Sequence, residues 1–428
     1  MASSRTSWDS RVRGTALRLA VSSARRVPAS VRFPLQRDGV DPVPRLEASR
    51  ERGDVMQLAR LLGTRVWLVT GYDAARAVLA DSDAFANDVR GLIGRQDRSP
   101  AERIGGLGMT DSPDHERLRR VLTPYFTRRR LATLRDDVDR VVAAALDDMA
   151  AHGPEVDLVA RFGFAVPFGV ICDLLGMPAV DRDEFRSHGA ARFDLRDGSA
   201  RLFDTAAGTR QFLIDLVAAE RRSPHLPDGL LARMVAEHGP GFDDVELGGL
   251  ADGVFLGGYE TSASMLALGA YLLADNPEAM ELVRTGDDET VDRVIEEMLR
   301  YLTVVQLAFV RFARHDLELG GRQIHAGDII GVSLLTANRD PGLGPDLESF
   351  DPHREPIRHL AFGHGLHRCV GSELARMELR IALRQLTRRF PDLHVVADLS
   401  ELEFRKLSAV YGVESLPVDL YEREPQSA

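Results

Sequence analysis

Apolar residues recur at helical spacing along most of this chain. They lie three or four positions apart within residues 129–150, 246–274 and 372–390, and this spacing predicts an amphipathic helix in each range. Much of the remaining chain follows the same pattern. Helices should therefore dominate the fold.

Strand-like segments are fewer and shorter. Residues 66–70, 317–334 and 416–420 are rich in apolar and β-branched residues. In the middle segment, Gly320 and Gly321 indicate the turn of a hairpin. The sequence thus predicts a mainly α protein with small antiparallel β-sheets.

No repeat, Gly/Ser linker or shift in composition divides the chain, so residues 36–428 are expected to form one large domain. Residues 1–35 are rich in Ser and Arg and nearly free of acidic side chains. A targeting peptide can have this composition. A flexible or loosely docked extension is the favoured interpretation.

Composition narrows the functional classes. The formal net charge of −11 argues against general nucleic-acid binding. No apolar run approaches the ~20 residues of a membrane span, so we expect a soluble protein. The two cysteines, Cys172 and Cys369, are too few for a disulfide framework, which favours the cytoplasm. Cys172 lies in an apolar helical run and is interpreted as inert core.

Cys369 stands in a loop rich in glycine and histidine, AFGHGLHRCVG, directly before a predicted helix. A helix N-terminus stabilises a thiolate, which predicts that Cys369 is a nucleophile or a metal ligand. A nucleophile would need a positioned base. A zinc site would need more ligands than His364 and His367. A thiolate on a porphyrin-bound iron needs no further protein ligand.

With the pattern F-G-x-G-x-H-x-C-x-G, the chain resembles the cytochrome P450 haem-thiolate monooxygenases of the soluble, actinobacterial type, from about residue 36 onward. The resemblance implies haem b (iron protoporphyrin IX) between the helix carrying Thr261 and the helix following Cys369. It also implies that Cys369 is the proximal iron ligand, that Phe362 packs beside the haem and that His367 meets a propionate.

A second motif lies within the predicted helix 246–274. Gly257 and Gly258 each cost about 1 kcal/mol relative to alanine in a helix interior, so we expect them to serve a geometric need. They could open a groove for a ligand, or simply allow close helix packing. The resemblance implies that both glycines line the cofactor, that Thr261 hydrogen-bonds dioxygen and that Glu260 helps to deliver protons.

Two further sets of charged residues match family positions. The resemblance assigns propionate binding to His115, Arg119 and Arg311, together with His367. Any one of these alone would more often be a surface charge. The resemblance also implies that a second set would form a structural ion-pair triad: Glu297, Arg300 and Arg354.

The chain has no flavin or dinucleotide fingerprint and no cysteines for an iron–sulfur cluster. A separate ferredoxin and an NAD(P)H-linked ferredoxin reductase are therefore implied as partners, with dioxygen as co-substrate. After Cys369, arginine recurs at every fourth position, at Arg376, Arg380, Arg384 and Arg388. This row could dock an acidic electron carrier; an ordinary solvated helix face explains it almost as well.

By resemblance, five apolar residues would line the substrate pocket: Phe85, Ile93, Phe193, Leu307 and Val410. Asp194, Arg196 and Gln306 could add polar selectivity. The implied activity is hydroxylation or epoxidation of an apolar small molecule, a secondary metabolite. The alternative in the same fold is oxidative C–C or C–N coupling of aromatic or cyclic-peptide substrates. A haem protein without turnover and a cysteine hydrolase are the other hypotheses.

Overall fold

The computed structural model describes residues 32–61, 63–88, 106–185, 199–405 and 407–421. These ranges are mainly helical, as the sequence predicted. The helices are α3 (Pro44–Arg50), α4 (Tyr72–Ala80), α5 (Asp114–Leu122), α6 (Arg128–Leu131), α7 (Arg135–Ala151), α8 (Ala165–Leu175), α10 (Ser199–Arg222), α11 (Leu230–His238), α12 (Asp244–Asp275), α13 (Pro277–Thr285), α14 (Asp288–Leu302), α15 (Leu334–Ala337) and α16 (Ser372–Arg389).

The strands are short, and most lie in two sheets. They are β1 (Arg37–Asp38), β2 (Asp41–Pro42), β3 (Val55–Leu61), β4 (Thr64–Val69), β5 (Phe85–Ala86), β6 (Glu155–Asp157), β7 (Arg311–Ala313), β8 (Leu317–Leu319), β9 (Arg322–Ile324), β10 (Ile329–Val332), β11 (His394–Val395) and β12 (Pro417–Asp419). One sheet has the order β3-β4-β10-β7-β5 and the other β11-β12-β6. Strands β1 and β2 pair with each other, as do β8 and β9.

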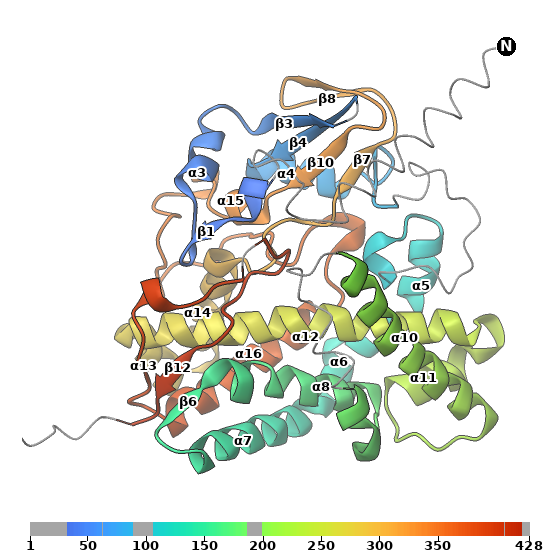
Figure 1. Cartoon of the computed structure of the whole chain (residues 1–428), viewed down its shortest axis with the longest axis vertical. Helices are drawn as coiled ribbons and strands as arrows, with labels where there is room; N and C mark the ends of the chain where they lie inside the picture. The colour runs from blue at the N-terminus through green and yellow to red at the C-terminus, as the bar shows by residue number, and fades with distance from the viewer. Residues whose placement is uncertain (1–31, 62, 89–105, 186–198, 406, 422–428) are drawn as a thin grey trace, which may run out of the picture.

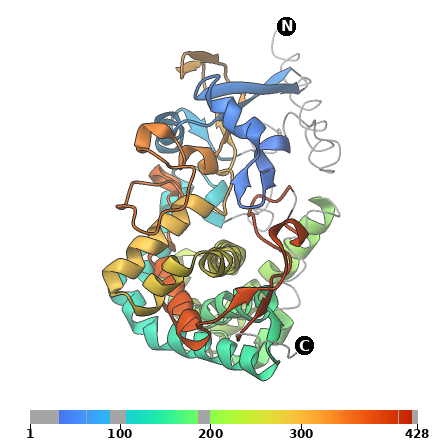
Figure 2. The ribbon, with the colours of Figure 1, turned by 90° about the vertical axis from the view of Figure 1, so that its left-hand side faces the viewer.

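Helix α12 is the axis of the helical body. It is 32 residues long and begins at a capping box formed by Asp243 and Glu246. Figure 1 shows it crossing the molecule, and Figure 2 shows it end-on with other helices around it. Because apolar residues occupy most of its circumference, the helix is buried rather than lying on the surface. The helix predicted at 246–274 is confirmed.

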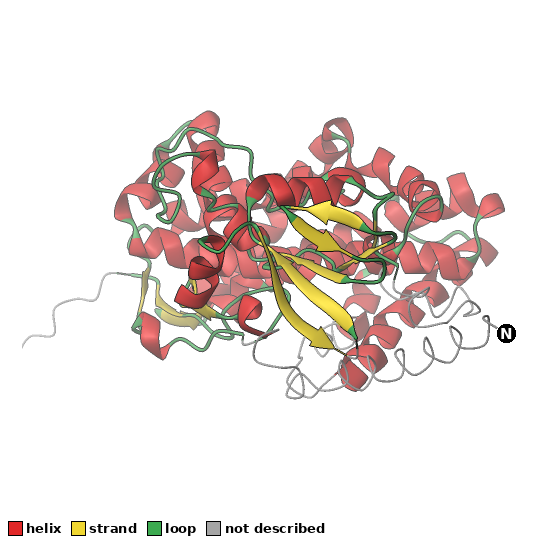
Figure 3. Ribbon diagram, turned by 90° about the horizontal axis from the view of Figure 1, so that it is seen from above, coloured by secondary structure: helices red, strands yellow, loops and turns green. Residues whose placement is uncertain are grey.

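The larger sheet lies beside the helical body (Figures 1 and 3). Strand β4 pairs with β10 in parallel and with β3 antiparallel, so the expectation of purely antiparallel sheets was wrong at this pair. The segment predicted at 317–334 forms the β8–β9 hairpin and then β10. Its turn has positive φ at Gly320 (54°) and Gly321 (71°), a conformation that glycine adopts without steric cost.

The remaining sequence predictions differ from the structure in detail. The helix predicted at 129–150 is divided by a 3-10 turn at Ala132–Leu134, and α16 ends at Arg389 as expected. Phe33 packs with Leu46, Leu68 and Leu335, so the folded domain includes residues before the predicted boundary at 35/36. The rest of the predicted extension, residues 1–31, lies outside the described residues.

Cys172 is fully buried in α8, which confirms its assignment to the core. In the part of the chain that the structure describes, no helix has both the length and the apolar character needed to cross a bilayer.

Helix α16 carries a buried carboxyl group, that of Glu378. This residue is 2% exposed, and its Oε1 atom has no hydrogen-bond partner. Burial raises the pKa of Glu378 to about 8, whereas an exposed glutamate in the unfolded chain has a pKa of about 4.3. Between these two values the unfolded chain loses a proton that the folded protein keeps. The contribution of Glu378 to folding stability is therefore fully present below the lower pKa and is lost as the pH rises through this window.

We predict that Glu378→Gln removes this loss of stability. The melting temperature of the variant minus that of the parent should increase from about pH 5 to about pH 8 and then level off, since one pKa unit corresponds to about 1.4 kcal/mol. Thermal unfolding across this pH range measures the effect. Glu289→Gln, at an exposed position on α14, is the control. A difference that does not vary with pH would contradict the prediction.

Candidate active site

The loop that carries Cys369 has the shape that its glycines predicted. Gly363 and Gly365 have φ of 68° and 69°. A Cβ at Gly365 would collide with the backbone of Leu79 and Ala80 in α4. The Cys369 N–H donates to the Phe362 carbonyl at 2.9 Å, which closes the loop just before α16 begins.

The Cys369 thiol is free, and the residue is exposed. Desolvation by the surrounding protein raises the pKa of the thiol. The backbone N–H of Gly371 and the Arg119 guanidinium act in the opposite direction but do not outweigh burial. The N–H at the start of α16 thus favours the thiolate, as the sequence predicted, while burial acts against it. A raised pKa disfavours a nucleophilic cysteine, whereas a bound metal cation deprotonates a thiol outright.

The two glycines of α12 serve different purposes. Gly257 is exposed in the middle of the helix, and a Cβ added there would meet nothing within 4 Å. The Thr261 hydroxyl donates to the Gly257 carbonyl at 2.6 Å. These two residues mark an open face of the helix, which we call the α12 groove. A Cβ at Gly258 would lie 2.6 Å from Cδ1 of Ile171 in α8, so Gly258 permits close packing of α12 on α8. The place of Gly258 beside the cofactor stays a prediction.

Glu260 does not share the α12 groove with Thr261. It is 3% exposed, and its Oε1 atom lies 2.8 Å from Nη1 of Arg405 near the C-terminus. Burial raises the pKa of Glu260 to about 8; the Arg405 cation opposes this shift and the Glu414 carboxylate adds to it. Arg405 was not predicted from the sequence, because the two partners are 145 positions apart and Arg405 lies in no recognisable motif.

Four nitrogen-bearing side chains predicted to bind propionates stand in or beside one buried region. The His115 and His367 rings are in edge contact, with centroids 4.4 Å apart. Arg119 Nη1 donates to the Leu366 carbonyl at 3.1 Å, within the Cys369 loop. Arg311 is 3% exposed and donates to the Phe309 carbonyl at 2.6 Å.

This cluster carries unused donors. Both ring nitrogens of His115 and Nδ1 of His367 are buried without a hydrogen-bond partner. Burial lowers the pKa of His367 to about 3, with His115 and Arg311 contributing. Burial also lowers the pKa of Arg311 to about 10. Buried groups of this kind are normally paired, and the two carboxylates of an iron porphyrin would supply the missing acceptors. The residues present fit a haem.

A metal site built from protein side chains alone would need several ligating side chains close together. Among the described residues, no three His, Cys, Asp or Glu side chains gather closely enough to hold a metal ion. The zinc alternative for Cys369 therefore finds no additional ligands in this part of the chain.

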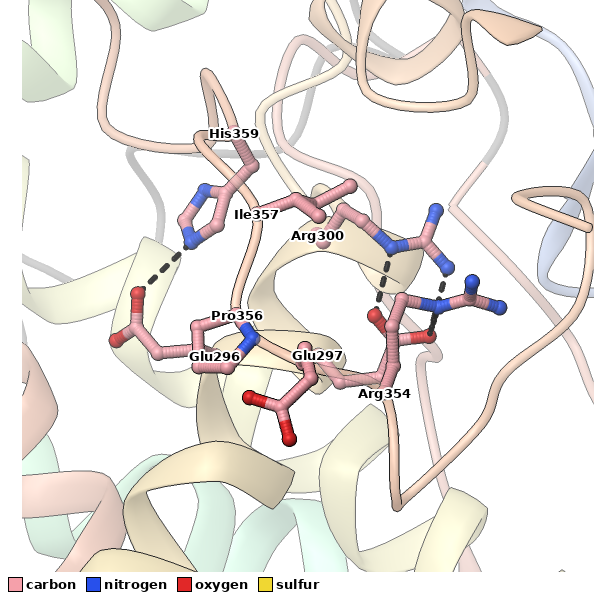
Figure 4. A pocket seen from close by; sticks show the side chains of 8 residues that line it. Glu296, Glu297, Arg300, Arg354, Pro356, Ile357 and His359 are labelled. Carbon is pink, nitrogen blue, oxygen red and sulfur yellow. Dashed lines mark hydrogen bonds and ion pairs between the residues drawn. The ribbon is translucent and has the colours of Figure 1, made fainter. Parts of the chain in front are cut away.

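The predicted ion-pair triad is present, and it is buried (Figure 4). Glu297 Oε2 accepts from Arg300 Nε at 2.7 Å, and Glu297 Oε1 accepts from Arg354 Nε at 3.0 Å. Next to it, the neighbouring carboxylate of Glu296 accepts from Arg376 and lies 3.0 Å from Nε2 of His359. Figure 4 shows the side chains of the triad, with Glu296 and His359, around a small pocket, where they are engaged with one another.

The arginine row of α16 is not a free basic face. Arg376, Arg380 and Arg384 form ion pairs with Glu296, Asp292 and Asp288 of α14, respectively. Arg388 donates to the Arg284 carbonyl. The interpretation of this row as a docking surface was wrong, because the row serves helix–helix pairing.

The predicted substrate residues fall into three groups. Leu307 and Val410 are partly buried, next to the bridge between Val305 and Val410. Phe85 is 4% exposed in β5 and packs in the core of the sheet, and Gln306 is fully buried and bonded to Arg37, so both assignments were wrong. The others lie outside the described residues: Ile93, Phe193, Asp194 and Arg196.

The structure adds apolar side chains that we did not assign individually to the pocket. Met109 and Phe309 are exposed large hydrophobic residues, and the Phe309 ring packs on Gly108. Val310, directly before Arg311, is also exposed. An apolar surface next to the cation cluster is therefore available to a ligand.

Comparisons with known proteins find similar sequences and structures over most of the chain. A family model for Cytochrome P450 matches residues 195–398. The chain is 36% identical to Cytochrome P450 165B3 of Amycolatopsis orientalis over 389 residues, which are 90% of this chain and 97% of that protein. It is 35% identical to Mycinamicin IV hydroxylase/epoxidase of Micromonospora griseorubida, covering 83% of this chain and 90% of that protein.

A solved structure also matches closely. OxyC, described as a cytochrome P450 implicated in an oxidative C–C coupling reaction during vancomycin biosynthesis, superposes with a TM-score of 0.81 at 34% identity. The match covers 91% of this chain and 97% of that chain.

We predict that His115→Phe and Arg311→Gln each weaken haem retention. Each variant removes a donor to a charged group, worth about 1.5–3 kcal/mol, so haem should transfer to apomyoglobin about tenfold to hundredfold faster. The transfer rate, followed by absorbance, measures this. Arg322→Gln, an exposed arginine in β9, is the matched control. Unchanged transfer rates in both variants would remove these residues from the haem site.

Proposed function

Because this chain belongs to the cytochrome P450 family, we propose that it hydroxylates or epoxidises an apolar small molecule, using dioxygen and electrons from a separate ferredoxin. The cofactor of the family is a haem iron, and we propose that it is haem b here. The observation that carries the proposal is the pairing of one free thiol, Cys369, with a buried cluster of unused nitrogen donors. That donor set matches an iron porphyrin and its two carboxylates.

The residues have distinct roles in this proposal. Cys369 would ligate the iron, Phe362 would pack beside the macrocycle, and four side chains would hold the propionates: His115, Arg119, Arg311 and His367. When bound, the thiolate-ligated haem supplies the oxidising power for attack on C–H or C=C bonds. Arg376 lies 4.6 Å over the Phe362 ring and is held by Glu296, which fixes the ring beside the Cys369 loop.

The α12 groove would manage protons. The Thr261 hydroxyl is a donor that can turn from the Gly257 carbonyl toward a ligand in the groove. An acid beside an alcohol suits proton delivery, because the pair can pass protons without competing as a strong ligand. Glu260 would be that acid, once it leaves Arg405.

The apolar residues around the site favour an apolar substrate. Leu307, Phe309, Met109 and Val410 present little hydrogen-bonding capacity, so they would bind hydrocarbon surface and exclude water. We propose a secondary metabolite as substrate, in line with relatives such as the Mycinamicin IV hydroxylase/epoxidase.

The electron donors would be a ferredoxin and its NAD(P)H-linked reductase. With the α16 row paired to α14, the docking surface would use other cations near Cys369. Arg120, Arg129 and Arg368 are exposed and form no ion pair with the described residues. An acidic carrier would be attracted to these charges.

Oxidative coupling is the second candidate reaction. It is favoured by the similarity to OxyC, a structure whose description names C–C coupling. In coupling, two radicals formed on one substrate join, and no oxygen atom needs to be retained. The same site residues would serve both reactions, so the substrate that fits against the apolar residues of the site would decide between them.

We predict that the reduced protein with carbon monoxide gives the strongly red-shifted Soret band of thiolate-ligated haem. Cys369→Ala should lose this band, because no other thiol is placed to ligate the iron. Cys172→Ala is the matched control and should keep it, since Cys172 is fully buried in α8. A purified protein with no haem band would refute the haem assignment, and Cys369 would then have a role other than iron ligation.

We also predict that product formed under labelled dioxygen contains one labelled oxygen atom. The measurement is mass spectrometry of products from a panel of apolar small molecules and of peptides with two aromatic side chains, with a surrogate ferredoxin and reductase. Product that has lost two hydrogen atoms without gaining label would favour coupling. Hydroxylated product without label would contradict both reactions.

A further inference from the structure

Two segments that carry proposed substrate contacts run side by side, although they are about a hundred positions apart. Leu307 belongs to residues 304–309, which follow α14, and Val410 belongs to residues 408–411 near the C-terminus. An antiparallel bridge between Val305 and Val410 joins them. We call residues 304–309 and 408–411 the two wall segments. Their separation helps to set the space that a ligand can occupy beside Leu307 and Val410.

Gln306 joins the wall segments from within the protein. It is fully buried, whereas its neighbour Leu307 is only partly buried. The Gln306 backbone N–H donates to the Ala409 carbonyl at 3.2 Å, and its side-chain Nε2 donates to the Ser408 carbonyl at 2.9 Å. Neighbouring side chains of an extended segment point to opposite faces, so Gln306 and Leu307 face different sides. Gln306 therefore acts on the wall segments without being a substrate contact itself.

Arg37, near the start of the folded domain, fixes the side chain of Gln306. It lies in β1, which pairs with β2. Arg37 Nε donates to Gln306 Oε1 at 3.0 Å. A guanidinium is only a donor, so this contact requires the amide oxygen on the Arg37 side and leaves the amide nitrogen for the Ser408 carbonyl. One orientation of the Gln306 amide thus satisfies both partners.

The same guanidinium holds the chain where it leaves α14. Arg37 Nη1 donates to the Leu302 carbonyl at 2.6 Å, and Nη2 donates to the Thr303 carbonyl at 2.7 Å. The last carbonyls of a helix have no partner within it and favour a nearby cation. Thr303 has a φ of 38°, which is a sparsely populated conformation for a residue with a side chain. Arg37 therefore supports the turn that gives the first wall segment its direction.

The second wall segment is tied to the same part of the chain. The Arg37 guanidinium stands 4.4 Å over the ring of Tyr411. The Tyr411 hydroxyl donates to the Gly39 carbonyl, in the turn between β1 and β2. Gly39 has a φ of 56°, which glycine adopts without steric cost. The turn that carries Arg37 thus contacts both wall segments.

We propose that Arg37 is a positioning residue that, through Gln306, holds the two wall segments at the separation that a bulky apolar ligand requires. This inference rests on the proposed monooxygenase function and assigns a specificity determinant to its site. Without the Arg37 donors, the Gln306 amide oxygen and two carbonyls at the end of α14 lose a charged partner, so the wall segments are no longer held at one separation. A small ligand that does not reach the wall segments should be unaffected.

Hydrogen–deuterium exchange of the purified protein tests this arrangement without any ligand. In Arg37→Gln, peptides that contain residues 304–309 and 408–411 should exchange about tenfold faster than in the parent protein, because lost hydrogen bonds lower the local protection. Peptides from α7 are the internal reference and should keep their rates. Unchanged rates in both wall segments would overturn the proposal.

Ligand binding to the holoenzyme tests the effect on the site. Imidazole and 4-phenylimidazole bind a haem iron through the same kind of nitrogen and differ in bulk, and the shift of the Soret band gives both dissociation constants. In Arg37→Gln the ratio of the 4-phenylimidazole constant to the imidazole constant should rise about tenfold, because the larger ligand must order the wall segments as it binds. A ratio within about twofold of the parent value, or a lower one, would overturn the proposal.

Three further variants separate positioning from a general loss of stability. Gln306→Glu keeps an acceptor for Arg37 but places a carboxylate oxygen against the Ser408 carbonyl, so it should also raise the ratio. This variant keeps the test decisive if Arg37→Gln folds poorly. Arg37→Lys keeps a cation at the end of α14 and should restore part of the parent ratio. Arg45→Gln removes an exposed arginine of α3 that stands 4.5 Å over the Phe33 ring, and as the matched control it should change neither the ratio nor the exchange.

The two levels of inference fail separately. Absence of the red-shifted carbon monoxide band in the parent protein would refute the proposed function, and with it the role in specificity. The exchange experiment would still decide whether Arg37 holds the wall segments. A normal band with unchanged exchange and an unchanged ratio would refute only the role of Arg37. Faster exchange with an unchanged ratio would make Arg37 a purely structural residue and would also overturn the proposal.

Discussion

The buried carboxylate of Glu297 holds in place the backbone from which the Cys369 loop begins. It accepts from Arg300 and Arg354, and Arg300 donates to the Asn338 and Leu347 carbonyls. Asn338 in turn accepts from the Leu360 N–H, one residue before the loop. Removing one partner of such a pair typically costs about 3–5 kcal/mol, because the charge left behind stays buried. The loop that carries the Cys369 thiol is thus held in place by a series of polar contacts that starts in α14.

The same chain uses arginine in two contrasting ways. Between α14 and α16, arginines form ion pairs with carboxylates at regular intervals, so their charges stabilise the packing of the two helices. Around His115 and His367, the cationic and imidazole groups find no carboxylate partner at bonding distance among the described residues. Since an unpaired buried polar group costs free energy, a ligand that brings anionic acceptors would stabilise the second arrangement. The arginines between α14 and α16 therefore differ from those around His115 and His367 in whether a carboxylate pairs with them, although the residue type is the same.

The sequence predicted the features whose signals are local. The periodicity of residues 246–274 and the paired glycines at 320 and 321 act through the helix or turn that contains them, and both were recovered. The features that were not predicted depend on contacts between segments far apart in the sequence. The arginine row had the spacing of a free face, yet α14 presents acids in the same register. Gly258 could not be told from Gly257 until Ile171 of α8 was placed beside it. Arg405 reaches Glu260 across the fold, so no window of sequence contains both.

Desolvation acts on both reactive acids of the site, and their partners set different outcomes. Burial raises the pKa of the Cys369 thiol and that of Glu260 alike. The Gly371 N–H and the nearby arginines oppose the first shift without outweighing it, and in the proposed haem site the iron cation would favour the thiolate. The second shift is opposed by Arg405, a cation that is part of the chain and contacts Glu260 on a different face of α12 from Gly257 and Thr261. A fixed cation in contact with the Glu260 carboxylate favours its ionised form and so opposes the effect of burial.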